Sequence, residues 1–173
     1  MRCLLALMLA LLLSGPARAD PADAAFRAGL AAYNEGAYGR AQAAWGPLAA
    51  AGDARAQAGL GFMEYSGRGV VRDSARAAEL FGRAADQGEP TAQLFLALMY
   101  FKSDGLPSNP PLAMMWIELA VGGGQPGAFE WRAAIMQALT EAERQEGWRL
   151  LARWRDSHPG KNAEKNAGPG SGN

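Results

Sequence analysis

The sequence from residue 54 to residue 88, ARAQAGLGFMEYSGRGVVRDSARAAELFGRAADQG, returns in outline from residue 90 to residue 124 as PTAQLFLALMYFKSDGLPSNPPLAMMWIELAVGGG. Gly52, Gly88 and Gly124 follow one another at intervals of 36 residues. The positions that match between the two units are Ala56 with Ala92, Gln57 with Gln93, Leu60 with Leu96, Met63 with Met99, Gly69 with Gly105 and Ala77 with Ala113. A period of this length is typical of a solenoid, because one small helical unit cannot bury its own apolar face.

Each unit has two runs of apolar residues at helical spacing, separated by a loop rich in glycine. The sequence therefore predicts an all-α fold, a right-handed α-solenoid of about four antiparallel helix pairs. The predicted units are an N-terminal helix pair at 20–53, two repeats at 54–89 and 90–125, and a C-terminal capping helix pair at 126–156. The last unit departs from the repeat pattern, as terminal units of solenoids often do.

The two ends of the chain differ from these units. Residues 1–19 combine Arg2, an apolar run from Leu4 to Leu13 and an Ala-x-Ala sequence at 17–19. This pattern predicts a signal peptide that is cleaved after Ala19, because the apolar run is shorter than the ~20 residues that span a bilayer. Residues 157–173 are rich in Gly, Asn, Lys and Pro and are predicted to be a disordered tail.

Charge and cysteine content exclude several classes of function. Without residues 1–19 the chain keeps 15 of its 17 basic residues and all 17 acidic residues, so its net charge is about −2, and no basic surface for nucleic acid is predicted. The single cysteine, Cys3, lies in the predicted signal peptide, so no disulfide, thiol chemistry or lipid attachment is expected in the mature chain. No other apolar stretch is long enough to span a membrane.

The repeated columns resemble the Sel-one-like repeat, a relative of the tetratricopeptide repeat with a longer loop between its helices. The resemblance extends over about residues 26–155 and rests on a short set of motifs. These are Ala56-Gln57-x-x-Leu60-Gly61-x-Met63, Gly67-x-Gly69-Val70, Ala77-x-x-Leu80-Phe81 and Ala84-Ala85-x-x-Gly88, with their counterparts in 92–120. Two positions depart from the pattern: Glu64 stands where the family usually has Tyr, and Ser103 replaces the first loop glycine.

The resemblance implies a scaffold for protein interactions, without catalysis, cofactor or metal. Together with the predicted signal peptide, it implies a periplasmic or secreted adaptor of the bacterial cell envelope that binds a protein or peptide on the concave face of the solenoid and is itself monomeric. Two alternatives stay open: a protein that binds peptidoglycan or another glycan, and a cell-wall enzyme related to β-lactamases. The carboxylates are scattered along the chain, and no nucleophile and base are placed together.

Aromatic residues supply the candidate binding site. Tyr65, Phe95 and Phe101 fall off the apolar stripe of the first helix of their units, and we expect them, with Glu64, to contact a partner on the concave face. By contrast, Trp45 and Trp116 fall in the repeated core columns and are predicted to be buried. His158, the only histidine, is predicted to lie in the disordered tail without a functional role.

Overall fold

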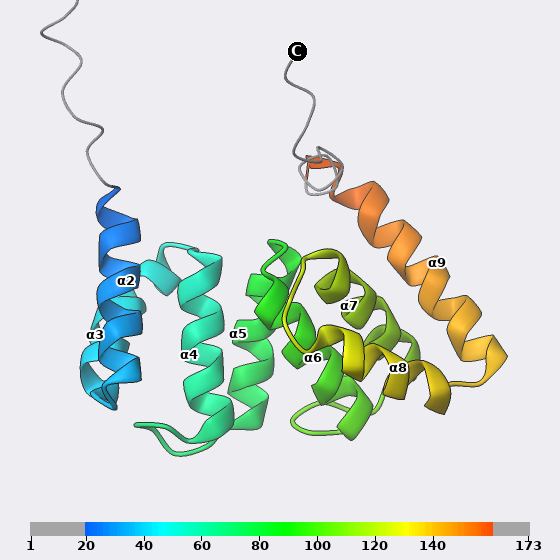
Figure 1. Ribbon diagram of the computed structural model, residues 1–173, viewed down its shortest axis with the longest axis horizontal. Coiled ribbons are helices and arrows are strands. Elements are labelled where there is room, and N and C mark those ends of the chain that lie inside the picture. Colours follow the sequence, from blue (N-terminus) through cyan, green and yellow to red (C-terminus); the bar gives the residue numbers. More distant parts are fainter. Residues whose placement is uncertain (1–19, 161–173) are drawn as a thin grey trace, which may run out of the picture.

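In the computed structural model, which describes residues 20–160, the chain is all-helical, with eight helices in a paired arrangement. The helices within these residues are α2 (Pro21–Asn34), α3 (Tyr38–Ala50), α4 (Ala54–Ser66), α5 (Ser74–Asp86), α6 (Pro90–Lys102), α7 (Pro110–Gly122), α8 (Ala128–Ala138) and α9 (Glu141–Ser157). Figure 1 shows the pairs stacked side by side in the order of the sequence. The predicted fold class is confirmed. The predicted signal peptide and most of the predicted tail lie outside the described residues.

The helix boundaries follow from capping residues. Asp73 accepts a hydrogen bond from Arg76 N at the start of α5, and Asn109 accepts one from Leu112 N at the start of α7. Thr140 and Glu143 form the capping box that begins α9. At the other end of the first helices, Gly67 after α4 and Ser103 after α6 both adopt left-handed backbone conformations, with φ of 67° and 57°. Ser103 therefore takes the strained position that glycine fills in the preceding repeat.

Small residues let neighbouring helices approach closely. Ala77, Ala84 and Ala113, all in the repeated columns, are fully buried. Trp45 is 3% exposed and Trp116 is 7% exposed, so the prediction that both belong to the core is confirmed. The buried residues form two clusters, a small one around Trp45 between α2, α3 and α4 and a larger one that continues to α9.

Two buried glutamines join each first helix to the second helix before it. The Gln57 side-chain amide donates a hydrogen bond of 3.1 Å to the carbonyl of Ala49, and Gln93 donates one of 3.2 Å to the carbonyl of Ala85. Both donors and both acceptors are related by the 36-residue period. The repeat period therefore places the same hydrogen bond at two successive boundaries between units, in addition to the apolar packing there.

The C-terminal end is packed differently from the repeats. Helix α9 lies mainly against α7, and α8 also lies against α7. Gly147 permits the close approach of α9, since a Cβ there would lie 2.5 Å from Sδ of Met114. Close to the predicted start of the tail, α9 ends at Ser157 and His158 follows it as the C-cap residue. Its ring stacks on Trp154 at 4.3 Å, and its Nδ1 lies 2.8 Å from the Trp154 carbonyl oxygen.

Candidate functional site

An open apolar pocket lies where the first helices of the first three units meet. Its volume is about 370 Å³, which falls in the size range of sites that take a small ligand or a large side chain. Its lining comes from α2, α3, α4 and the start of α6: Phe26, Leu30, Tyr33, Trp45, Arg55, Ala58, Gly59, Phe62, Glu89 and Thr91. We call these ten residues the α2–α4–α6 pocket, and the surface formed by α2, α4, α6 and α8 the first-helix face.

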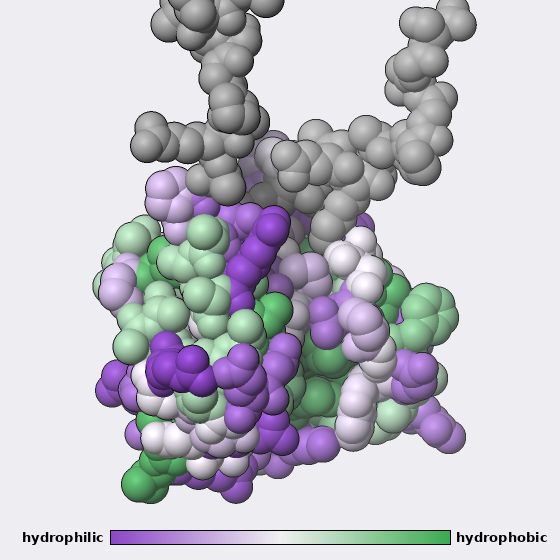
Figure 2. All heavy atoms as spheres, turned by 60° about the vertical axis from the view of Figure 1, so that its left-hand side comes forward, coloured by the Kyte–Doolittle hydropathy of each residue, from purple (hydrophilic) through white to green (hydrophobic). Residues whose placement is uncertain are grey.

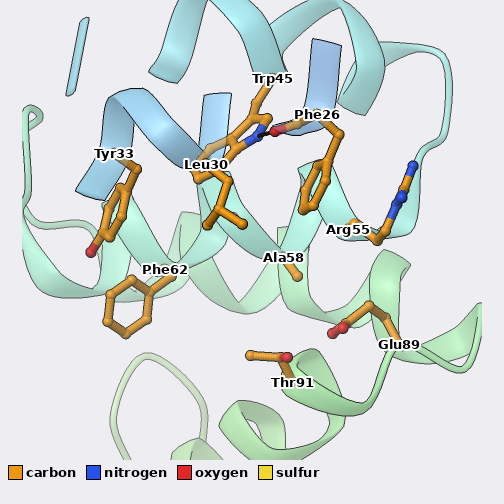
Figure 3. Close-up of a pocket in the computed structure, with 10 residues that line it drawn as sticks. Phe26, Leu30, Tyr33, Trp45, Arg55, Ala58, Phe62, Glu89 and Thr91 are labelled. Carbon is orange, nitrogen blue, oxygen red and sulfur yellow. Dashed lines mark hydrogen bonds between the residues drawn. The ribbon is translucent and has the colours of Figure 1, made fainter. Parts of the chain in front are cut away.

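Figure 3 shows how these side chains are distributed. Tyr33 and Phe62 lie together at one end of the pocket, and Arg55 and Glu89 lie at the other end, with Leu30 between the two ends. Leu30 is 43% exposed, a large value for an apolar side chain that borders a pocket. Figure 2, in which the N-terminal end comes forward, shows a hollow with hydrophobic residues on its floor and hydrophilic residues along much of its border.

The position of Trp45 is fixed by two glycines. A Cβ at Gly29 would overlap the indole ring, and a Cβ at Gly59 would lie 2.9 Å from it. The indole Nε1 donates a hydrogen bond of 3.1 Å to the carbonyl of Phe26, so its polar atom is satisfied. Trp45 reaches from the second helix α3 between α2 and α4, and there it supplies one apolar wall of the pocket.

The two ends of the pocket differ in charge. At one end the Arg68 guanidinium lies 5.6 Å from the Tyr33 ring centroid and 5.7 Å from that of Phe62, and its Nη1 donates a hydrogen bond of 2.6 Å to the Tyr33 hydroxyl. At the other end lies Glu89, whose carboxylate caps α6 by accepting a hydrogen bond of 2.7 Å from Ala92 N. Burial raises the pKa of Glu89 above its usual range, although the hydrogen bonds from Ala92 and Thr91 act in the opposite direction.

Arg55 lies beside Glu89 but is already neutralised. Its guanidinium lies 4.5 Å from the Phe26 ring centroid and pairs with Asp23 at 2.9 Å and Asp53 at 3.0 Å. The remaining polar side chain of the pocket, Thr91, donates a hydrogen bond of 3.1 Å to Gln125 Oε1. The polar groups at this end of the pocket thus have structural roles, and the central part of the pocket is apolar.

Two of the four predicted partner-binding residues lie together. Phe95 packs on Tyr65 with ring centroids 5.6 Å apart, and also on Phe62 at 5.2 Å and Phe81 at 5.0 Å. Because Phe62 also lines the pocket, this aromatic cluster extends the pocket along the first-helix face. Tyr65 and Phe95 are half-buried, so part of each ring is used for packing between units.

Glu64 and Phe101 are placed differently from this pair. The Glu64 side chain is only 14% exposed. Its Oε1 forms an ion pair with Nε of Arg76 on α5 at 3.0 Å, so Glu64 already has a partner within the chain. Phe101 is half-buried near the end of α6 and packs against the larger core cluster. Whether any of the four contacts a partner stays a prediction.

The pocket itself was not predicted from the sequence. Phe26, Leu30 and Tyr33 share one face of α2 by their spacing, which is equally typical of core packing. The α4 side of the pocket depends on Gly59, which gives no periodic signal. Leu30 indicates a pocket only when the neighbouring unit is seen beside α2, because its position in the sequence alone is that of a core residue.

Within residues 20–160, no group of three His, Cys, Asp or Glu side chains is placed to hold a metal ion. The helices in the same range are all too short or too polar to cross a bilayer.

Comparisons with known proteins agree with this architecture. The family model described as Sel1 repeat matches residues 54–89 and 90–124. No curated protein matches the chain in sequence. Among solved structures, a protective antigen present in uropathogenic Escherichia coli strains, c5321, which displays an SLR fold, superposes with a TM-score of 0.76 at 25% identity over 90% of this chain. The match covers 35% of that antigen, so the chain spans about a third of its length.

A Sel1 repeat protein from Oxalobacter formigenes is 31% identical, with a TM-score of 0.58. That match covers 66% of this chain and 89% of the Oxalobacter protein. The repeat boundaries, the helix pairs and these two structures lead to one assignment: this chain belongs to the Sel1 repeat family.

Proposed function

We propose that this protein is a non-catalytic scaffold of the bacterial cell envelope, which binds a segment of a partner protein on its first-helix face. The observation that carries this proposal is the α2–α4–α6 pocket, an open apolar pocket of about 370 Å³ formed by three successive units. A fixed apolar pocket with an exposed leucine beside it is suited to one large apolar side chain of a partner, since such anchors dominate protein interfaces.

The polarity of the walls favours a peptide over a glycan. A sugar presents many hydroxyl groups, and each one that is buried without a hydrogen bond is costly. Around Leu30 and Trp45 the walls are apolar, and the Thr91 hydroxyl and the Glu89 carboxylate are already used in hydrogen bonds within the chain. Both groups also have structural roles, Glu89 as the cap of α6 and Thr91 as the partner of Gln125, which favours binding over catalysis.

The envelope location is part of the proposal and rests on the sequence of residues 1–19. The apolar run from Leu4 to Leu13 and the Ala-x-Ala sequence that follows it are typical of an exported protein. The 36-residue repeats support binding more generally, since solenoids present extended surfaces to their partners.

Photocrosslinking in the producing bacterium tests the proposal. A photoreactive amino acid replaces Leu30 beside the pocket or, as a control, Glu79, which is exposed on the second helix α5. We expect one dominant crosslinked protein from position 30, absent from position 79 and absent when the cells are not irradiated. Equal crosslinking from both positions, or crosslinking only between copies of this chain, would overturn the proposal.

A further inference from the structure

We propose that the partner segment is acidic: it carries Asp or Glu side chains close to its apolar anchor, and Arg68 pairs with one of them. This inference rests on the proposed function and names the chemistry of the partner. It is carried by the position and the charge balance of Arg68, at the Tyr33–Phe62 end of the α2–α4–α6 pocket.

The Arg68 side chain is held in place, although it lies on the surface. It contacts two rings that line the pocket, Tyr33 and Phe62, and its Nη1 donates to the Tyr33 hydroxyl. A guanidinium has five N–H donors. Within residues 20–160 the Arg68 guanidinium makes this one hydrogen bond, and the residue is exposed, so its other N–H groups can donate to both oxygens of a carboxylate.

The charge of Arg68 is not compensated within the described part of the chain. Two other arginines that lie over aromatic rings are neutralised, Arg55 by Asp23 and Asp53, and Arg72 of the α4–α5 loop by Asp104 at 2.6 Å. No carboxylate of residues 20–160 lies within 4.0 Å of a side-chain nitrogen of Arg68. An arginine that is preordered by aromatic rings loses less conformational entropy when it binds a carboxylate.

The opposite end of the pocket sets the direction of the segment. Glu89 lies there half-buried and makes no ion pair within residues 20–160, while its neighbour Arg55 is already paired with Asp23. A second carboxylate beside Glu89 would be repelled, whereas one beside Arg68 is attracted. The acidic residues therefore lie on the Arg68 side of the apolar anchor.

An acidic side chain fits better than a C-terminal carboxylate. Beyond Phe62 the first-helix face continues through Phe95 and Tyr65 to Lys102, whose Nζ lies 4.3 Å from the Trp131 ring centroid. This second cation on an aromatic ring also has no ion pair among the described residues. A segment that passes Arg68 and continues toward Lys102 would gain from a second acidic residue.

Selection from a library of random dodecapeptides displayed on phage tests this inference. The library is panned against the purified wild-type protein, against R68E, and against R83E, which reverses an exposed charge on the second helix α5 and serves as the matched control. We expect wild type and R83E to enrich peptides with a large apolar residue flanked on one side by Asp or Glu. R68E should replace this acidic enrichment by Lys or Arg and keep the apolar residue.

A selected peptide then allows the affinity to be measured directly. By fluorescence anisotropy, R68Q should bind it about two- to fivefold more weakly than wild type, the size expected for one half-exposed charge pair. Changing the peptide's Glu to Gln should weaken binding to wild type but not to R68Q. Because R68Q is milder than R68E, it gives an answer even if the charge reversal disturbs folding. Amidation of the peptide's C-terminus should have no effect.

The outcomes separate the two proposals. An apolar enrichment without acidic residues, or an acidic enrichment that R68E leaves unchanged, would overturn the inference about Arg68 and leave the peptide-binding function standing. Dependence of the affinity on the terminal carboxylate rather than on the Glu side chain would also overturn it. If no apolar anchor is enriched by any of the three proteins, both the inference and the proposed function fail.

Discussion

The side-chain amide of Gln93 donates a hydrogen bond of 3.2 Å to the carbonyl oxygen of Ala85, across the boundary between two repeats. One period earlier, Gln57 makes the same bond to Ala49 at 3.1 Å. The two glutamines differ in the surroundings of their side-chain oxygen, Oε1. Oε1 of Gln57 accepts a hydrogen bond of 2.9 Å from Gln87, whereas Oε1 of Gln93 is buried with no partner among the described residues.

The missing partner of Gln93 leads to the first prediction. The position equivalent to Gln87 is Gly123, which ends α7 with φ of −78° and ψ of −5°, nearly the values of −81° and −2° at Gln87. We expect Gly123→Gln to raise the free energy of unfolding by about 1–2 kcal/mol, through the new hydrogen bond and the loss of glycine flexibility. Urea denaturation measures this, with Gly123→Ala as the control for flexibility alone. Equal stability of the two variants would contradict the hydrogen-bond argument.

The second prediction concerns the wall of the pocket. Gly59→Ala would place a Cβ 2.9 Å from the Trp45 ring, so we expect overpacking to cost about 1–3 kcal/mol and to lower the melting temperature. Gly82→Ala, in the middle of α5, meets no atom within 4 Å and should gain up to about 1 kcal/mol from helix propensity. Calorimetry of both variants checks the contrast, and a Gly59→Ala protein as stable as wild type would show that the indole is not tightly held.

Leu30 gives a prediction that separates binding from stability. Since its side chain is 43% exposed, Leu30→Asp should change the free energy of unfolding by less than about 1 kcal/mol. The same change places a charge beside the apolar pocket and should reduce peptide affinity at least about tenfold, because burial of an unpaired charge is costly. Glu79→Ala on α5 is the control, with affinity unchanged. Full affinity in Leu30→Asp would place the binding site elsewhere.

Glu89 should make stability depend on pH in a defined direction. Burial raises the pKa of its carboxyl in the folded protein, so the folded chain binds this proton more tightly than the unfolded chain. The stabilisation is present at low pH and is lost as the pH rises through the folded pKa. Relative to Glu89→Gln, which keeps an oxygen to accept from Ala92 N, wild type should therefore lose stability as the pH rises from the ordinary carboxyl pKa through the raised pKa of the folded protein. Urea denaturation at several pH values measures this difference, and a constant difference would contradict it.

The sequence predicts the helix pairs because the apolar spacing that defines each helix is local and recurs with the 36-residue period. Trp45 and Trp116 fall in the repeated apolar columns, so their burial could be predicted from spacing alone. The stacking of His158 on Trp154 just after α9 has no periodic signal in the sequence and was not predicted.

The pocket could not be predicted in the same way, because it is made between units. Leu30 on α2, Phe62 on α4 and Glu89 before α6 are far apart in the sequence. Taken alone, the first two could be ordinary packing residues and Glu89 an ordinary helix cap. Of the residues proposed from the sequence, Tyr65 and Phe95 lie next to the pocket through Phe62, whereas Glu64 is engaged by Arg76. Which exposed side chains face one another depends on the rotation between units, and the 36-residue period does not specify that rotation.

The most direct test of the central claim is a nuclear magnetic resonance titration of the ¹⁵N-labelled protein with a phage-selected acidic peptide. We expect the largest changes in chemical shift on the amides of α2, α4 and the start of α6, and on the indole N–H of Trp45. Apart from Trp45 itself, little change is expected along α3, α5 and α9. Changes confined to the second helices or to α9 would contradict the claim that the α2–α4–α6 pocket is the binding site.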